Sequence, residues 1–341
     1  MKIKKFPLSG LAMIVIVLIL LNSAMIATAV RSSLELCFSV IIPSLFPFMV
    51  MSSFFVGNMK NTLPGFVGRV LEYLFGFSFR GTGAFLCGLL CGYPIGARCA
   101  SQLYREGKIS KSEAETLLAC ANNSGPLFII GAVGCQMLNS FKWGLMLWGV
   151  HIFCAIFFAI VLKSRTYVKA HKEFSFIKEK PLSESISESV VNILNVCGFV
   201  VFFSVINILV EPFAKLFPEK IQKLIFCFFE ITNGINKVSH SGYFFNQKLY
   251  IIAFALGWSG LSVHMQVKNI VAGLGLSMKK YYFVRVMSAV ISPFILFAVL
   301  DLKDNIFASV PIPVIKACVL TMVMPGLIIT IIKIKKRKKV M

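Results

Sequence analysis

The sequence predicts an all-α polytopic membrane protein of about eight transmembrane helices plus two re-entrant hairpins, arranged as an inverted repeat with helices broken at mid-membrane. Three observations predict this class. Of the 341 residues, 57% are hydrophobic and only 14% are charged, whereas a soluble domain has about 25% charged residues. Apolar runs of about 20 residues, the length that spans a bilayer, recur along the whole chain. Glycine, proline and asparagine interrupt two of these runs, and broken helices persist in a membrane only beside protein or a wet cavity.

The first apolar run follows a basic start at residues 1–5 and extends to Val30. It is longer than the apolar core of a signal peptide, so a transmembrane helix is favoured over a cleaved leader, although Ala27-Thr28-Ala29 resembles a cleavage site. The last run precedes a basic tail at 333–339, which is expected to face anionic lipid in the cytoplasm. The apolar segments together are 8–30, 33–57, 82–103, 116–140, 143–162, 186–212, 221–240, 247–275, 281–300 and 312–333.

Lysine and arginine decide how these segments thread through the membrane, because cytoplasmic loops carry the excess of both. If every segment crossed, the basic loop 163–185 would lie outside, against this rule. The rule is satisfied if 33–57 and 186–212 are re-entrant hairpins that enter and leave on one side. Pro43 and Pro47 support the first hairpin, whereas the second has only a glycine at its middle. The loops then expected inside are 104–115, 163–185, 213–223 and 277–285.

Each half of the chain then contains one hairpin followed by three crossings, and the two hairpins open to opposite sides. The halves are therefore expected to be inverted, as in many secondary transporters. A weak sequence echo agrees, since Asn123-Ser124-Gly125-Pro126-Leu127 resembles Trp258-Ser259-Gly260-Leu261-Ser262. The expected parts are an N-terminal transmembrane helix (1–32), a first gate-like repeat (33–162), a basic cytoplasmic linker (163–185), a second, inverted repeat (186–300), and a C-terminal transmembrane helix with a basic tail (301–341).

The strongest local signal is Asn122-Asn123-Ser124-Gly125-Pro126, two amides and a hydroxyl before a Gly-Pro pair in an apolar context. A helix that restarts at Pro126 presents free N–H groups and the positive end of its dipole, which together bind a carboxylate or phosphate. The alternative is a kinked, packed helix whose amides are satisfied by neighbours. The adjacent asparagines favour a polar site.

The earlier break, Gly92-Tyr93-Pro94-Ile95-Gly96, offers a ring and a hydroxyl at Tyr93. Gly92 and Gly96 also have the spacing of a small-residue helix contact. Arg98 either extends its charge to the membrane edge or binds a substrate anion. In the second half, Glu230-Ile231-Thr232-Asn233-Gly234 occupies the equivalent place.

Glu230 is an acidic residue inside an apolar segment, and intramembrane carboxylates are costly and usually functional. It could pair with Arg98 or Lys268, bind a cation or exchange a proton, and Asn233 follows it closely. The alternative is a purely structural ion pair.

Further along the second half, Ser259, Gly260, Ser262 and Gln266 form a polar strip on nearby helix faces. His264 within this strip is interpreted as the only histidine deep in a span, and it could titrate near neutral pH. A hydrogen-bonded core histidine is the alternative.

Catalytic and metal-binding patterns are missing from the sequence. The ten cysteines lie mostly in apolar segments and are interpreted as free thiols; Cys87 and Cys91 share a helix face, but no histidine or acid completes a metal set. No nucleotide-binding loop or catalytic triad appears. The sequence therefore predicts no enzyme, no cofactor and no metal site, and the net charge of +21 is attributed to cytoplasmic loops rather than to nucleic-acid binding.

Several of these stretches resemble the sporulation integral membrane protein YlbJ (SpoVV) family. The most specific are Leu90-Cys91-Gly92-Tyr93-Pro94-Ile95-Gly96-Ala97-Arg98, Ser112-Glu113-Ala114-Glu115 and Asn122-Asn123-Ser124-Gly125-Pro126-Leu127-Phe128-Ile129-Ile130-Gly131. Ile42-Pro43-Ser44-Leu45-Phe46-Pro47-Phe48, Phe229-Glu230-Ile231-Thr232-Asn233-Gly234 and Gly260-Leu261-Ser262-Val263-His264-Met265-Gln266 resemble its other signatures. The chain departs from the family at Trp258, where a small residue is expected, and in a second hairpin without proline.

The resemblance implies a nucleoside recognition or gate domain, similar to parts of concentrative nucleoside transporters and of the membrane domain of the ferrous-iron transport protein. It also implies an integral protein of the mother-cell-derived outer forespore membrane that moves dipicolinate, a planar pyridine dicarboxylate. Two carboxylates suit two helix N-termini or a cationic clamp. The residues expected to bind the solute are Ser44, Tyr93, Arg98, Asn122, Asn123, Ser124, Gly125, Asn233, Ser259, Gly260, Ser262 and Gln266, with Glu230 and His264 expected to couple ions or protons.

Two alternatives stay open at this point. One is a transporter of a nucleoside or another small polar solute. The other is a membrane scaffold or sensor of spore assembly that carries no flux. The expected partners are a small anionic solute and membrane lipid, without nucleic acid, and a homo-oligomer is left open.

Overall fold

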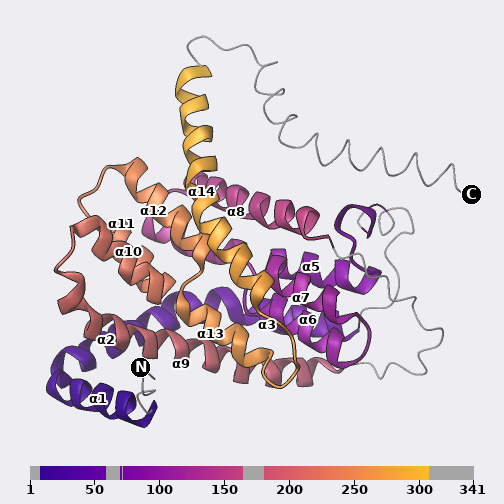
Figure 1. Cartoon of the computed structure of the whole chain (residues 1–341), viewed down its shortest axis with the longest axis horizontal. Coiled ribbons are helices and arrows are strands. Elements are labelled where there is room, and N and C mark those ends of the chain that lie inside the picture. Colours follow the sequence, from indigo (N-terminus) through magenta and orange to yellow (C-terminus); the bar gives the residue numbers. More distant parts are fainter. Residues whose placement is uncertain (1–7, 59–69, 71, 164–179, 307–341) are drawn as a thin grey trace, which may run out of the picture. The chain divides into compact units, whose positions relative to one another are not determined.

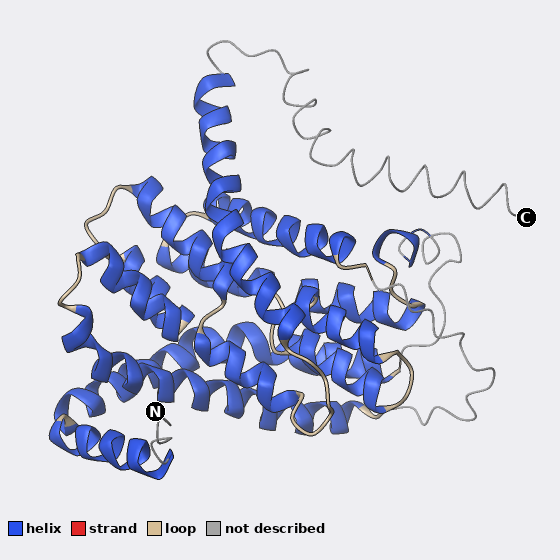
Figure 2. Ribbon diagram, in the orientation of Figure 1, coloured by secondary structure: helices blue, strands red, loops and turns tan. Residues whose placement is uncertain are grey.

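Helices make up nearly all of the chain that the structure, a computed structural model, describes (Figures 1 and 2). The described residues are 8–58, 70, 72–163 and 180–306, and none of them lies in a strand. The elements are α1 Leu8–Leu21, α2 Ser23–Leu36, η1 Cys37–Ile41, α3 Ile42–Gly57, α5 Phe79–Cys91, α6 Ile95–Arg105, α7 Lys111–Cys120, η2 Leu127–Met137, α8 Phe141–Val161, α9 Leu182–Ala214, α10 Glu219–Phe229, α11 Ile231–Ser239, α12 Phe245–Trp258, α13 Leu261–Ile270 and α14 Lys279–Ile306.

Five stretches of the described chain are long and apolar enough to cross a bilayer. They are Ser23–Phe55, Phe141–Val161, Leu182–Ala214, Phe245–Ile270 and Lys279–Asp301. The prediction of a helical membrane protein is thereby confirmed. The expected last crossing, 312–333, lies outside the described residues.

Both re-entrant hairpins were predicted in the wrong place, because 33–57 and 186–212 belong to continuous helices. Segment 33–57 extends α2 through the π-helical turn η1 into α3, and this wider turn accommodates Pro43 at the start of α3. Segment 186–212 lies within α9, a single helix of 33 residues. The segment 8–30, expected as one helix, is instead divided at Asn22 between α1 and α2.

The observed hairpins are the two segments that were predicted to cross. Helices α5 and α6 pack against each other and turn at 92–94, and α10 and α11 pack against each other and turn at Glu230. Each arm has 9 to 13 residues. At 1.5 Å per residue such an arm extends about 14–20 Å, which is too short for the ~30 Å hydrocarbon core.

Two further helices are interrupted along their course, and the sequence predicts the first of these breaks. The break at 121–126 separates α7 from η2, and the break at Ser259 and Gly260 separates α12 from α13. Ser259 and Gly260 both have positive φ, 74° and 81°. Since glycine adopts such angles at little cost, Gly260 suits a position where one helix stops and another starts.

The order of elements repeats along the chain. A long helix, a hairpin, an interrupted helix and an uninterrupted helix occur as α2–α3, α5–α6, α7–η2 and α8, and again as α9, α10–α11, α12–α13 and α14 (Figure 1). The chain divides into two units, Met1–Pro293 and Phe294–Met341, and all of the site described below belongs to the first. The linker and terminal boundaries expected from the sequence stay predictions.

Candidate functional site

Glycines bring the tip of the first hairpin onto the break of the first interrupted helix. A Cβ atom on Gly92 would lie 2.7 Å from Gly125 Cα, and Tyr93 N donates a hydrogen bond to Asn123 O. Gly88 and Gly96, on the two arms, both press against the carbonyl group of Ala121. The small-residue contact is therefore made by Gly88 and Gly96 on the interrupted helix, rather than by Gly92 and Gly96 as one helix face.

The second half is built in the same way. A Cβ atom on Gly260, in the break between α12 and α13, would lie 3.0 Å from Ile231 N at the tip of the second hairpin. Gly234 on α11 packs against Cys227 on α10, so the two arms of the hairpin touch closely. In each half, a hairpin tip thus meets the break of the following interrupted helix.

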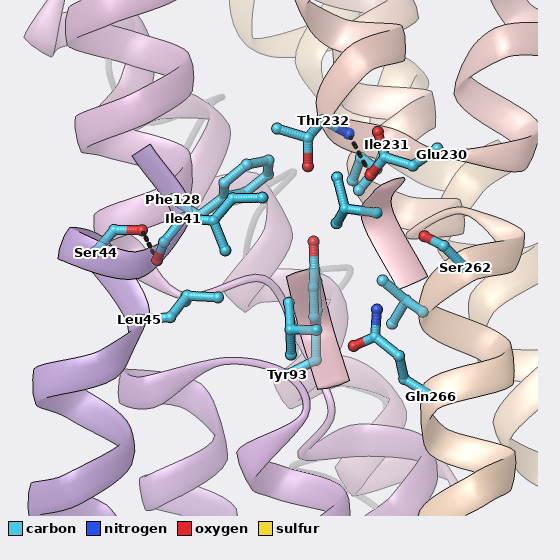
Figure 3. A pocket seen from close by; sticks show the side chains of 14 residues that line it. Ile41, Ser44, Leu45, Tyr93, Phe128, Glu230, Ile231, Thr232, Ser262 and Gln266 are labelled. Carbon is cyan, nitrogen blue, oxygen red and sulfur yellow. Dashed lines mark hydrogen bonds between the residues drawn. The ribbon is translucent and has the colours of Figure 1, made fainter. Parts of the chain in front are cut away.

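A small cavity lies where these breaks come together (Figure 3). Its walls come from η1, α3, α9, both hairpin tips, η2 and α13. The lining residues are Ile41, Ser44, Leu45, Tyr93, Gly125, Phe128, Val196, Val200, Glu230, Ile231, Thr232, Ser262, Val263 and Gln266. Six residues predicted as site residues therefore line one cavity, namely Ser44, Tyr93, Gly125, Glu230, Ser262 and Gln266; Thr232 was missed.

The polar atoms of this cavity are only partly satisfied. Ser44 Oγ donates to Ile41 O at 3.1 Å, whereas Ser262 Oγ and Gln266 Oε1 are buried without a hydrogen-bond partner. Figure 3 shows Tyr93 standing beside Gln266, with its hydroxyl group directed into the cavity. Buried polar atoms without partners are costly, so they mark a place where a ligand or water binds.

Glu230 is fully buried and caps α11. Its carboxylate accepts hydrogen bonds from Thr232 N at 3.0 Å and from Asn233 N at 2.7 Å. A carboxylate at the start of a helix is stabilised by the free N–H groups and by the helix dipole. No ion pair joins Glu230 to a lysine or arginine of the described chain, so the expected pairing with Arg98 or Lys268 is not observed.

Arg285 is the central residue that the sequence analysis missed. It was assigned to the loop 277–285, but it lies in α14 with 1% of its surface exposed. Its guanidinium group donates to Asn123 Oδ1 at 3.2 Å, Ala119 O at 3.3 Å and Ser259 Oγ at 3.4 Å. Arg285 thus connects the breaks of both interrupted helices, which include two predicted site residues.

The histidines behave differently from the prediction. His264 is buried, but its Nδ1 bonds the Tyr281 hydroxyl at 2.8 Å and its ring packs on Trp258 at 4.3 Å between centroids. His264 is not the only deep histidine, because His151 in α8 is also buried and its Nε2 accepts a hydrogen bond from Ser124 N at 3.0 Å. His151 was overlooked, although it lies in the middle of a long apolar run.

Trp258, at the position where a small residue was expected, joins an interrupted helix to a hairpin. Its indole N–H donates to Phe228 O at 3.0 Å, and its ring stacks on Phe228 at 5.0 Å. The large side chain therefore packs beside the second hairpin, and it does not line the cavity.

Eight predicted site residues do not line the cavity, namely Arg98, Asn122, Asn123, Ser124, Asn233, Ser259, Gly260 and His264. Arg98 is half-buried on α6 and Asn233 is half-buried on α11, where its amide donates to Ser33 Oγ at 3.5 Å. Asn122 is fully buried, and both atoms of its side-chain amide lack a partner. Among the residues that the structure describes, no three His, Cys, Asp or Glu side chains gather to hold a metal ion.

The chain resembles a known protein of sporulating bacteria. It is 30% identical over 308 residues to the sporulation integral membrane protein YlbJ of Bacillus subtilis (strain 168), and the alignment covers 77% of this chain and 74% of that protein. No family model matches the sequence, and no solved structure matches it. On this identity and coverage, the chain belongs to the YlbJ family of sporulation integral membrane proteins.

Proposed function

We propose that this protein is a secondary transporter that moves a small organic anion, dipicolinate, across the outer forespore membrane during sporulation. One observation carries the proposal: two hairpin tips and two interrupted helices, related by the repeated order of elements, enclose one buried cavity with unpartnered polar atoms. Interrupted helices at the interface of two repeats are the usual substrate site of secondary transporters.

The element order also supports inversion of the two halves. Each repeat has one hairpin that returns to its own side. With α7–η2 counted as a crossing beside the five long apolar stretches, each repeat also has three crossings, and an odd number of crossings reverses the direction of the second repeat. Rocking of one repeat against the other would then open the cavity to each side in turn.

The planar pyridine ring of dipicolinate suits the lining. Apolar side chains from α3, η2 and α9 provide contact area, Tyr93 provides an aromatic face, and Ser262 and Gln266 provide polar groups that lack partners. Glu230 is the candidate for proton or cation coupling, because its carboxylate lines the cavity. His264 is a weaker candidate, since its ring is packed against aromatic side chains.

The test is dipicolinate flux into liposomes that contain the purified protein, with uridine as the competing neutral solute. We expect wild-type protein to accumulate dipicolinate, and Gln266→Ala to weaken its binding about 3- to 10-fold, because one hydrogen bond to a charged ligand is lost. Gln102→Ala is the matched control, since Gln102 lies on α6 away from the cavity.

The outcomes separate the alternatives. Uridine flux without dipicolinate flux would reassign the protein to nucleosides or related polar solutes. No flux and no binding of either compound by a well-folded protein would favour a scaffold or sensor, and it would overturn the proposal.

A further inference from the structure

Arg285 is a buried cation without a counter-ion among the residues that the structure describes. Its three hydrogen bonds go to a carbonyl oxygen, an amide oxygen and a hydroxyl group, and all are long, at 3.2 to 3.4 Å. No carboxylate of the described chain forms an ion pair with it. A buried charge is costly unless it is paired, so the positive charge of Arg285 lacks the negative partner that would offset the cost of its burial.

Buried polar side chains that neighbour Arg285 along α14, or that neighbour its partner Asn123 in the sequence, also lack hydrogen bonds. Arg285 Nε has no partner, and neither has Ser288 Oγ, which lies three residues further on α14 and therefore on the same helix face. Asn122, which precedes the Arg285 partner Asn123, leaves both its amide oxygen and its amide nitrogen unpartnered. These three side chains are each at most 1% exposed. Two of the unpartnered atoms, Arg285 Nε and Asn122 Nδ2, are donors that a carboxylate could satisfy.

Arg285 also lies directly behind the cavity wall. The link is Asn123, whose side chain accepts from Arg285 and whose backbone carbonyl accepts from Tyr93 N. Tyr93 and Gly125 both line the cavity. Asn123 therefore links the guanidinium group to the cavity wall at Tyr93.

We propose that Arg285, with the amide of Asn122, forms a carboxylate-binding subsite at the meeting point of the two interrupted helices. This inference rests on the proposed transport of an organic anion and assigns the residue that selects for its charge. A carboxylate accepts two parallel N–H bonds from a guanidinium group, which would use the free Nε–H and supply the missing negative charge.

A purely structural role predicts a different behaviour. Arg285 could serve only to hold the C-terminal ends of α7 and α12, where helix dipoles favour a cation. In that case its replacement would change stability but would leave the preference between charged and neutral ligands unaltered. Charge selectivity, rather than activity alone, therefore distinguishes the two roles.

The experiment measures binding of dipicolinate and of its neutral diamide, pyridine-2,6-dicarboxamide, to the purified full-length protein. Wild type should prefer the dianion, and Arg285→Gln should lose that preference by about 10- to 100-fold, with Arg285→Lys in between. Asn122→Ala keeps all three hydrogen bonds of Arg285 and should weaken dipicolinate binding about 3- to 10-fold, which keeps the test valid if Arg285→Gln fails to fold. Arg105→Gln, a change of the same charge at an exposed position on α6, is the control.

The outcomes distinguish this inference from the transport proposal. If wild type binds dipicolinate and both Arg285→Lys and Asn122→Ala bind it equally well with unchanged selectivity, the subsite is refuted while the transport proposal stands. If wild type binds another carboxylate, such as citrate, in a manner that depends on Arg285, the subsite stands and the substrate is reassigned. If wild type binds no carboxylate, both proposals fail.

Discussion

At the scale of residues, two buried charges of opposite sign are each held by helix ends. The carboxylate of Glu230 sits on the N-terminal N–H groups of α11, and the guanidinium group of Arg285 faces Ala119 O near the C-terminal end of α7. The dipoles of these helices stabilise both charges. Because neither residue forms an ion pair with another described residue, each can accept an external partner in the proposed transport cycle.

The first prediction concerns Glu230→Gln, which should fold but should lose the dependence of dipicolinate flux on pH. Glutamine keeps one acceptor oxygen for the start of α11, and loss of a full cap costs only about 1 kcal/mol. It also mimics a protonated carboxyl, so flux at alkaline pH should equal flux at acidic pH. Flux in liposomes across neutral pH measures this, with the exposed Glu219→Gln as control. If the variant kept the pH profile of the wild type, Glu230 would not be the residue that couples flux to protons.

Residues of the site differ in how far the sequence could predict them. Asparagines, serines and a glutamate inside apolar runs were recognisable because polar side chains there are costly. Arg285 was not predicted as a site residue because it is the seventh residue of α14. A basic residue so near the start of a helix could equally belong to the preceding loop. Its burial depends on α7 and α12 packing beside it, and no local pattern encodes that contact.

At the scale of elements, glycine decides where a chain folds back. Of the breaks at 92–94, 121–126, Glu230 and 259–260, composition predicted the first two. Whether a break becomes a hairpin tip or a simple interruption depends on tertiary contacts, such as those of Gly88 and Gly96 with Ala121. For the same reason Pro43 and Pro47 were misread as a hairpin, although one π-helical turn accommodates the chain there.

The second prediction follows for Gly96→Ala. The added Cβ atom would lie 2.6 Å from the carbonyl carbon of Ala121, and a backbone atom cannot move aside without shifting the interrupted helix. We expect a loss of about 1–3 kcal/mol of stability, seen as a lower midpoint of thermal unfolding in detergent. Gly149→Ala in α8 is the matched control: it meets no atom within 4 Å and should be neutral or stabilising by up to ~1 kcal/mol. Equal melting of both variants would contradict the close packing of hairpin and break.

At the scale of the whole molecule, the observed hairpins change which segments are expected to cross the membrane, but the expectation that the two halves are inverted is kept. The basic linker 163–185 is expected inside, and then α8 ends inside and α9 begins inside. It follows that the first hairpin opens to the inside and the second hairpin opens to the outside. On that assumption, loops 104–115 and 277–285 also lie inside, as the distribution of lysine and arginine predicts. Loop 213–223 then lies outside, unlike in the predicted threading, because α9 is one continuous helix and would cross the membrane once.

The third prediction tests this inversion through the loops that follow the two hairpins. Glu106 follows α6 and Gly242 follows α11, so they should lie on opposite faces of the membrane. In intact cells that carry the protein in their plasma membrane, a membrane-impermeant thiol reagent should label Gly242→Cys, a position where a side chain meets no atom within 4 Å, and should label Glu106→Cys only after permeabilisation. Wild-type protein provides the background from its native cysteines, of which Cys135 is exposed. Labelling of both variants from the same side would mean that the two halves run parallel, and rocking of inverted repeats could then no longer explain access to the cavity from both faces.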